Sequence, residues 1–369
     1  MTATAHAIVQ HGPRDLRPED LPLPDITTDD AILRIEACGI CGSDYEQYEG
    51  TLRAPYPVIP GHEPVGVIDQ IGDAAAERWD LRPGDRVAVE ALLPCGRCPD
   101  CMANRPNLCR GDGAPPILGF RPTTLAPGLW GGYATHLYLP PTARLHRMSP
   151  DVPAEIAVLF NPIGAGFRWA VDMPHLAPGE TIVILGPGQR GLASVIAARE
   201  AGASRIIVTG LTRDEPKLDL ARRFGATHTI DIEAGGPSGG NPVRVVREIT
   251  DGAGADVVVD VTAYATEAVT QAIDIARRGG RIVLAGTKGQ NPVANFLSDR
   301  VVTKELTIYG AIGVDSASYA RAVTTIEQRW RDLAPMHTHT LPLDEAPHAL
   351  DLLAGKIEGE PATHIALLP

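Results

Sequence analysis

The strongest constraint on the fold is an alternation of short apolar runs with helical segments, which begins near residue 180. The apolar runs are continuous, as is typical of strands buried on both faces of a parallel sheet. The strand segments are TIVILG, RIIVTG, THTIDI, ADVVVDVT and GRIVLAG, and the helical segments are LASVIAAREAG, KLDLARRFGA, PVRVVREIT and TEAVTQAIDIARRG. The Gly-rich stretch 235–240 is interpreted as a surface loop before a helix. The pattern predicts an α/β domain with a doubly wound parallel sheet.

Three glycines, Gly186, Gly188 and Gly191, follow the first of these strands in the pattern G-x-G-x-x-G. The first permits a tight turn, the second lets the backbone approach a pyrophosphate, and the third lets the helix pack on the strand. The N-terminus of that helix offers unpaired N–H groups to phosphates. We predict a dinucleotide site here; the alternative is a packing turn without a ligand.

The second strand of this domain ends in Gly210, where an acidic residue would usually bond the adenosine ribose. Without the acid, Arg213 or Lys217 could bind the 2′-phosphate of NADP. Asp214 and Glu215 in the same loop could instead serve the ribose of NAD. The sequence leaves NAD and NADP equally open.

Four cysteines lie within fifteen residues, at Cys95, Cys98, Cys101 and Cys109. Thiolates at such short spacing suit a tetrahedral zinc ion, and the alternative is a set of buried or redox cysteines. Because the protein fills all four positions, we predict a structural zinc site with no open position for chemistry.

A second group of candidate ligands lies nearer the N-terminus, in the segments CGICGSDYEQYEG and PGHEPVG. Cys41 and His62 are good zinc ligands, and a carboxylate such as Glu63 can complete a three-ligand site with one open position. Spacing alone does not separate this hypothesis from an ordinary core histidine.

The remainder of the N-terminal region, to about residue 160, contains short strands interrupted by Pro and Gly. Its strand segments are DAILRIEAC, PVIPGHEPVGVIDQIG, DRVAVE and GGYATHLYL. This spacing predicts a compact antiparallel or barrel-like unit.

The length of the chain indicates its number of domains, and its net charge limits the kinds of partner that it binds. A chain of 369 residues predicts two domains, and the net charge of −12 argues against partners such as nucleic acid or an anionic membrane. No apolar run approaches the roughly 18 residues of a membrane helix. The first thirty residues lack the apolar core of a secretory signal, so we expect a cytoplasmic protein.

In combination these motifs resemble the zinc-dependent medium-chain alcohol dehydrogenases, in particular the sorbitol- and threonine-dehydrogenase-like branch. The motifs that occur in family order are GICGSD, GHEPVG, the four-cysteine lobe, GGYATH, GPGQRG, GADVVVDVT, GGRIVLAG and KELTIYG. The resemblance covers nearly the whole chain.

The resemblance implies a GroES-like, β-rich catalytic domain over residues 1–162 and a Rossmann dinucleotide-binding domain over 163–302. Residues 303–369 would return to the catalytic domain. The implied activity is reversible hydride transfer between an alcohol and NAD(P)⁺. Relatives form dimers or tetramers, often through their Rossmann strands, and KELTIYGAIG would supply such an edge.

By resemblance, Cys41 and His62 bind a catalytic zinc, and Glu63 binds it or lies beside it. Cys38 matches no ligand position and is interpreted as a small buried residue. The chain departs from the family at Asn161, where relatives carry a further Cys or Glu ligand. A neutral amide is a poor zinc ligand, so the alternatives are a site of three residues and water, or an empty site.

The family's proton path implies that Ser43 carries the alcohol proton away from the metal. Glu46 stands where many relatives have the histidine that ends this path, so it either accepts the proton or is merely exposed.

Three alternatives to an alcohol dehydrogenase remain at this point. The first is a zinc-free medium-chain reductase of enones or quinones that keeps only the structural zinc. The others are a nucleotide-sensing zinc module and a catalytically silent relative.

The substrate is the least constrained property. Several large side chains lie in segments that line the pocket in relatives: Tyr45, Tyr48, Leu52, Phe120 and Trp130. An aromatic pocket would favour a bulky or cyclic secondary alcohol over a polyol, but these residues could equally belong to the core. Both classes of alcohol stay open.

Overall fold

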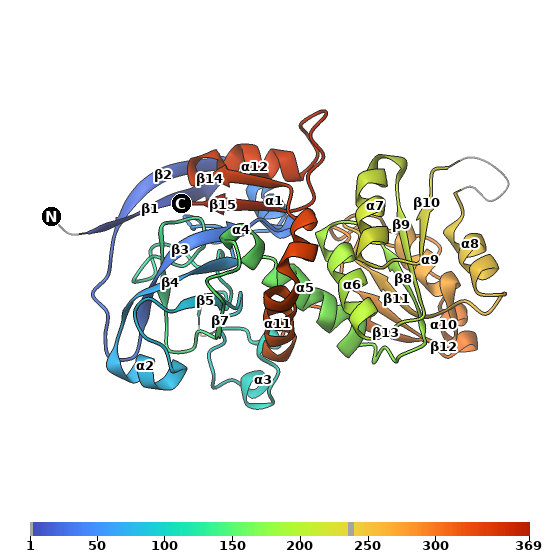
Figure 1. The fold of residues 1–369 in the computed structure, drawn as a ribbon, viewed down its shortest axis with the longest axis horizontal. Helices are drawn as coiled ribbons and strands as arrows, with labels where there is room; N and C mark the ends of the chain where they lie inside the picture. Colours follow the sequence, from blue (N-terminus) through green and yellow to red (C-terminus); the bar gives the residue numbers. More distant parts are fainter. Residues whose placement is uncertain (1–2, 112, 235–239) are drawn as a thin grey trace. The chain divides into compact units, whose positions relative to one another are not determined.

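The computed structural model describes residues 3–111, 113–234 and 240–369. Its contacts divide the chain into two compact units, Met1–Asn161 with Asp315–Pro369, and Pro162–Val314. Each unit has its own sheet, as Figure 1 shows. Of the Gly-rich stretch predicted as a loop, residues 235–239 lie outside the described residues.

The unit Pro162–Val314 is built on a six-stranded parallel sheet in the order β10-β9-β8-β11-β12-β13. Its strands are β8 (Thr181–Leu185), β9 (Arg205–Gly210), β10 (His228–Asp231), β11 (Ala255–Asp260), β12 (Ala276–Leu284) and β13 (Thr307–Gly310). Its helices are α6 (Gln189–Glu200), α7 (Glu215–Phe224), α8 (Pro242–Ile249), α9 (Glu267–Ile275) and α10 (Ser298–Lys304). Figure 1 shows α6 and α7 on one face of the sheet and α8, α9 and α10 on the other. This is the predicted doubly wound Rossmann arrangement, with the strand order that binds dinucleotides.

One helix of this unit is shorter than the sequence pattern predicts. The segment TEAVTQAIDIARRG predicts a helix to Gly279, but α9 ends at Ile275 and β12 begins at Ala276. The Lys304 ammonium donates to the carbonyl oxygens of Ile273, Asp274 and Ala276 at 2.7, 3.1 and 2.5 Å. A side chain from α10 thus satisfies the carbonyls that continuing helix turns would otherwise have bonded.

The unit Met1–Asn161 with Asp315–Pro369 contains a mostly antiparallel sheet, in the order β14-β15-β3-β4-β5-β7 with β6 also paired to β3. Its strands are β3 (Ala31–Gly39), β4 (Pro64–Ile71), β5 (Arg86–Val89), β6 (His136–Leu139), β7 (Leu145–Arg147), β14 (His339–Pro342) and β15 (Ile365–Leu368). A separate hairpin joins β1 (Thr4–Gly12) and β2 (Asp15–Pro22). The helices are α1 (Gly42–Glu49), α2 (Asp73–Trp79), α3 (Pro99–Met102), α4 (Ala154–Ala157), α11 (Ser316–Leu333) and α12 (Ala346–Leu353), and α5 (Phe160–Gly166) crosses the boundary.

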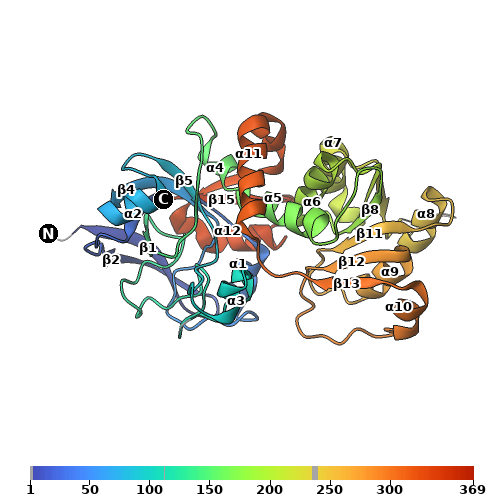
Figure 2. The same cartoon turned by 90° about the horizontal axis from the view of Figure 1, so that it is seen from below.

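The C-terminal segment joins the sheet of this unit through β15, whose residues Ala366 and Leu367 pair with Gly39 and Cys38 of β3. The division of the chain lies between Val314 and Asp315, however, and not after residue 302. Residues 303–314 contribute β13 to the Rossmann sheet because β13 pairs in parallel with β12. Figure 2 shows β13 beyond β12, where it is the last strand of the sheet order.

No helix in the described ranges is long and apolar enough to cross a membrane.

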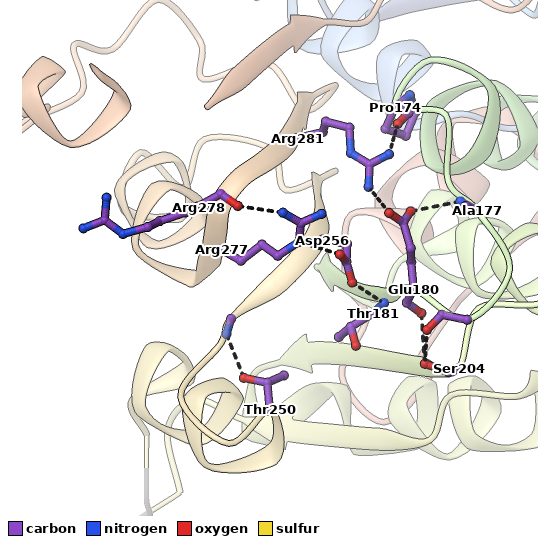
Figure 3. A network of polar contacts seen from close by, with 12 residues as sticks. Pro174, Ala177, Glu180, Thr181, Ser204, Thr250, Asp256, Arg277, Arg278 and Arg281 are labelled. Atoms are coloured by element: carbon purple, nitrogen blue, oxygen red, sulfur yellow. Dashed lines mark hydrogen bonds and ion pairs between the residues drawn. The ribbon is translucent and has the colours of Figure 1, made fainter. Parts of the chain in front are cut away.

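Two ion pairs, Arg281–Glu180 and Arg277–Asp256, connect the strands at the N-terminal end of the Rossmann sheet (Figure 3). The Arg281 guanidinium binds Glu180 and also donates to the carbonyl oxygen of Pro174 at 2.8 Å. The side chains of both charged residues are mostly buried, at 17% and 19% exposure. Asp256 accepts a hydrogen bond from the backbone N–H of Thr181 at 2.8 Å, which fixes β11 against β8.

We predict that Arg281→Met lowers the free energy of unfolding by about 2–3 kcal/mol, because Glu180 loses a charge-assisted partner while staying largely buried. The measurement is the thermal unfolding midpoint by calorimetry. Arg244→Met is the matched control, since its pair with Glu248 is 3.8 Å long and exposed, and we expect it to change stability by less than about 0.5 kcal/mol. Equal losses in the two variants would contradict the prediction.

Candidate functional site

A cluster of possible metal ligands lies where β3 ends and β4 begins. The antiparallel register places Cys38 opposite Pro64, so the residues flanking this pair meet despite their distance in the sequence. One ligand atom from each of Cys41, His62 and Glu63 lies within 4.8 Å of the others. The structure therefore brings together the three residues predicted for a catalytic zinc, and this donor set suits zinc with a position left for substrate.

Two glycines make the space for this cluster. Gly61 has φ = +89°, and a Cβ there would lie 2.4 Å from the ring of Tyr133 and 3.0 Å from Sγ of Cys38. A Cβ on Gly39 would lie 2.6 Å from Oε2 of Glu63. Larger residues at either position would displace the ligand-bearing segments.

Asp44 orients the cluster, although no role for it was predicted from the sequence. Its Oδ1 lies 3.1 Å from Nδ1 of His62, and its Oδ2 accepts a hydrogen bond from the backbone N–H of Cys41 at 2.8 Å. Occupying Nδ1 leaves Nε2 of His62 for a metal, which is the usual role of a carboxylate behind a ligating histidine. A carboxylate three residues after a candidate cysteine ligand, in the first turn of a helix, was the available signal.

The electrostatics of the cluster favour a cation. Burial opposes a charged imidazole, but the Asp44 charge and hydrogen bonds with Asp44 and Cys41 outweigh it, so the pKa of His62 lies well above its ordinary value. Burial raises the pKa of the Cys38 thiol well above its usual range. Cys38 therefore stays a neutral buried thiol, which agrees with its interpretation as a core residue.

Ser43 and Glu46 lie three residues apart on α1, so they share one face of the helix directly after Cys41. Both are partly exposed. Asn161 is buried at the start of α5, and its amide nitrogen donates to the hydroxyl of Tyr319 at 3.1 Å. The amide is thus used in packing α11 against α5.

Of the side chains predicted to line a substrate pocket, Phe120 lies beside the cluster, with its ring centroid 6.5 Å from that of His62. Trp130 is buried in the core, where its indole N–H donates to the carbonyl oxygen of Leu125 at 2.7 Å and its ring packs edge-on against Tyr138. Trp130 therefore belongs to the hydrophobic core of this unit.

The four cysteines of the second predicted site also converge. The Sγ atoms of Cys95, Cys98, Cys101 and Cys109 lie within 4.8 Å of one another, and none of them is in a disulfide. Sγ of Cys109 accepts hydrogen bonds from the backbone N–H groups of Cys95 and Gly111, both at 3.3 Å. Four sulfur donors at this spacing fit a closed tetrahedral zinc site.

The sulfur atoms differ in how readily they lose a proton. The backbone N–H groups of Arg97 and Cys98 lower the pKa of Cys95 to about 6. Burial, followed by the bond with Cys98, raises the pKa of Cys101 to about 12. Without a metal the cluster therefore holds only part of its possible negative charge, and a zinc ion would displace the remaining protons.

The glycine-rich turn between β8 and α6 has the predicted geometry. Gly186 has φ = +99°, and Gly188 precedes α6 with nothing within 4 Å of an added Cβ. A Cβ on Gly191 would lie 1.9 Å from the carbonyl oxygen of Gly186, so only glycine fits there. The open backbone at Gly188 is the surface that a pyrophosphate would approach.

The turn after β9 contains the charged residues that were predicted to bind either the ribose of NAD or the 2′-phosphate of NADP. Asp214 is committed to local contacts, since its Oδ2 accepts from the backbone N–H of Leu211 at 3.1 Å and its Oδ1 lies 3.7 Å from Nζ of Lys217. Arg213 is exposed, and Gly210 ends the strand without a side chain. Glu215, the other acid that could serve a ribose, pairs with Arg222, whereas Arg213 is an exposed cation.

Two family descriptions match the chain. Residues 27–150 match "Alcohol dehydrogenase GroES-like domain", and residues 191–328 match "Zinc-binding dehydrogenase".

Curated relatives extend over almost the whole sequence. A probable alcohol dehydrogenase of Mycobacterium tuberculosis is 43% identical over 100% of this chain and 99% of the relative. The erythritol/L-threitol dehydrogenase of Mycolicibacterium smegmatis is 32% identical over 98% and 97%, and the sorbitol dehydrogenase of Bacillus subtilis is 35% identical over 82% and 81%.

Solved structures agree with this assignment. An alcohol dehydrogenase from Thermotoga maritima superposes with a TM-score of 0.87 at 27% identity, over the full length of both chains. A zinc-binding dehydrogenase from Sinorhizobium meliloti, bound to NADP, has a TM-score of 0.82 at 27% identity, also over both full lengths.

The comparisons confirm the predicted fold class and enzyme class and lend no support to the zinc-free reductase. The chain belongs to the zinc-binding, medium-chain alcohol dehydrogenase family and is an oxidoreductase that acts on alcohols.

Proposed function

We propose that this enzyme oxidises a secondary hydroxyl of a small polyol to a ketone with NADP⁺, reversibly, at a zinc site formed by Cys41, His62 and Glu63. The observation that carries the proposal is the three-residue cluster with Asp44 behind His62. The relatives named for erythritol, threitol and sorbitol support the substrate class.

In the proposed scheme the thiolate of Cys41, Nε2 of His62 and the carboxylate of Glu63 would hold the metal. Zinc bound there would supply Lewis-acid polarisation of the substrate oxygen, and a bound NADP⁺ would supply the hydride acceptor. Asp44 keeps His62 in the tautomer that presents Nε2. The hydroxyl proton leaves through the Ser43 hydroxyl to the Glu46 carboxylate and then to water. Asn161 is not among the proposed ligands, and its amide donates to the Tyr319 hydroxyl instead.

The second proposed zinc site is structural and comprises Cys95, Cys98, Cys101 and Cys109. Its thiols, and the absence of disulfides among the described cysteines, support a reducing compartment such as the cytoplasm.

We predict two zinc ions per chain in the wild-type protein and one in His62→Ala, with kcat/KM in the variant reduced by at least about 10³-fold because a ligand is lost. Zinc is measured by elemental analysis, and activity by NADP⁺ reduction with erythritol, sorbitol and cyclohexanol. We expect the two polyols to be preferred.

The control is His228→Ala, which removes an exposed histidine and should retain both zinc ions. Wild-type protein that holds one zinc even after incubation with excess metal would overturn the zinc mechanism. A clear preference for cyclohexanol would overturn the substrate class alone.

The proposal that NADP⁺ is the cofactor rests on three features. Gly210 ends β9 without a side chain, Asp214 is bonded to the Leu211 N–H and Lys217, and Arg213 is exposed. We predict that Arg213→Ala raises KM for NADP⁺ by roughly 10- to 100-fold, because the variant loses one charge-assisted hydrogen bond to the 2′-phosphate. KM for NAD⁺, which lacks that phosphate, should stay within about twofold. Arg223→Ala, which removes an exposed arginine of the following helix α7, is the control and should change neither KM. A wild-type preference for NAD⁺ would contradict the proposal.

We also propose that the protein forms a homodimer through β13. This strand ends the sheet order, and Ile308 and Ile312 are 36% and 63% exposed at that edge. An apolar strand edge offers unpaired backbone groups to a second copy.

Ile308→Lys should convert a dimer to a monomer at micromolar concentration, as measured by analytical ultracentrifugation. Met102→Lys, which changes an apolar residue that is 75% exposed in the other unit, should leave the dimer intact. A dimer that survives Ile308→Lys would contradict this interface.

A further inference from the structure

A buried ion pair lies at the C-terminal ends of β11 and β12, and nothing in the proposed chemistry uses it. Asp260 is the last residue of β11 and has no exposed surface. Lys288 follows β12, and its side chain is only 12% exposed. Its Nζ lies 2.8 Å from Oδ2 of Asp260. A charged pair this deeply buried requires further hydrogen bonds to offset desolvation.

Thr262 provides those bonds. Nζ of Lys288 donates to the Thr262 carbonyl oxygen and, at 3.0 Å, to its hydroxyl. Oδ1 of Asp260 accepts from the Thr262 backbone N–H at 3.0 Å and from its hydroxyl at 2.6 Å. Thr262 thus accepts two hydrogen bonds from the ammonium, whose third contact is the ion pair with Oδ2 of Asp260. The effect of Lys288 is therefore exerted through Thr262.

The same contacts fix two loops against each other. The backbone N–H groups of Ala285 and Gly286 both donate to the carbonyl oxygen of Asp260, at 2.9 and 3.0 Å, and the N–H of Tyr264 donates to Thr287 at 3.0 Å. A Cβ on Gly286 would lie 2.1 Å from the Thr262 carbonyl oxygen. The loops 261–266 and 285–289 therefore form one closely packed surface.

This surface adjoins the phosphate-binding turn. A Cβ on Gly186 would lie 2.9 Å from Cγ2 of Thr262. The strand order reverses between β8 and β11, which is the point at which open α/β sheets bind ligands beyond the C-terminal ends of their strands. The half-sheet β8–β10 carries the glycine-rich turn and the adenine half of a dinucleotide. The half-sheet β11–β13 is left for the nicotinamide half.

We propose that Lys288 and Asp260 are positioning residues that hold Thr262 and its two loops as a preformed support for the nicotinamide half of the cofactor. The inference rests on the proposed cofactor site. A support that is already ordered spares the dinucleotide the cost of ordering two loops on binding. Removing the ammonium frees Thr262 and leaves a buried carboxylate without its partner.

The test compares two probes on full-length, zinc-loaded enzyme: NADPH, and adenosine 2′,5′-bisphosphate as its adenine half. If the wild-type enzyme prefers NADH, the pair is NADH and AMP. We expect Lys288→Met to raise Kd for the dinucleotide at least tenfold and to change Kd for the fragment by less than twofold. Thr262→Val, which keeps the shape but loses the hydroxyl, should shift the two constants in the same directions.

Arg281→Met is the matched control because it breaks the ion pair with Glu180, which directly precedes β8 at the N-terminal end of the sheet. It should lower the unfolding midpoint but leave Kd for the dinucleotide within twofold. If Lys288→Met and Thr262→Val bind the dinucleotide like the wild type, the positioning role is overturned and the cofactor proposal is unaffected. The positioning role is also overturned if fragment binding weakens equally, or if Arg281→Met weakens dinucleotide binding as much. Wild-type enzyme that binds neither probe would overturn the cofactor proposal as well.

Discussion

The pairing of β3 with β4 is the contact on which the proposed metal site depends. Its register places Cys38 opposite Pro64, so Cys41 and the His62–Glu63 pair, separated by a long loop, meet at one end of the two strands. The β15 strand pairs along the same end of β3 and holds it from the other side. A slip of one residue in this pairing would turn every side chain of β3 to the opposite face of the sheet. Core packing therefore fixes the register, and with it the positions of the candidate ligands.

Those parts of the molecule that depend on local pattern were predictable from the sequence. The turn at Gly186–Gly191 requires three glycines at set positions for steric reasons, and four thiols at short spacing have few uses other than a zinc ion. The continuous apolar runs after residue 180 likewise match strands that are covered on both faces. Each of these signals is contained within a few residues, so no tertiary information was needed to interpret it.

The features that escaped prediction depend on contacts between distant segments. The end of α9 is set by Lys304, a residue of a later helix, which takes up the carbonyls at Ile273, Asp274 and Ala276. The predicted boundary at residue 302 failed to include β13, whose place is decided by its pairing with β12. Asp44 and Lys288 look like ordinary surface charges in the sequence. Their importance comes from the buried partners that the fold brings to them.

Charge balance connects these buried groups and explains why Asn161 is compatible with a metal site. A buried carboxylate is costly unless a cation compensates it, and Asp44 and Glu63 both lie almost wholly out of water beside Cys41. A divalent zinc held by one thiolate and one carboxylate is electrically neutral, and the Asp44 charge is then shared with His62. A further anionic ligand at position 161 would leave the centre with excess negative charge in a poorly solvated site. A neutral amide bonded to Tyr319 avoids that cost, so the departure from the family pattern is consistent with an active metal centre.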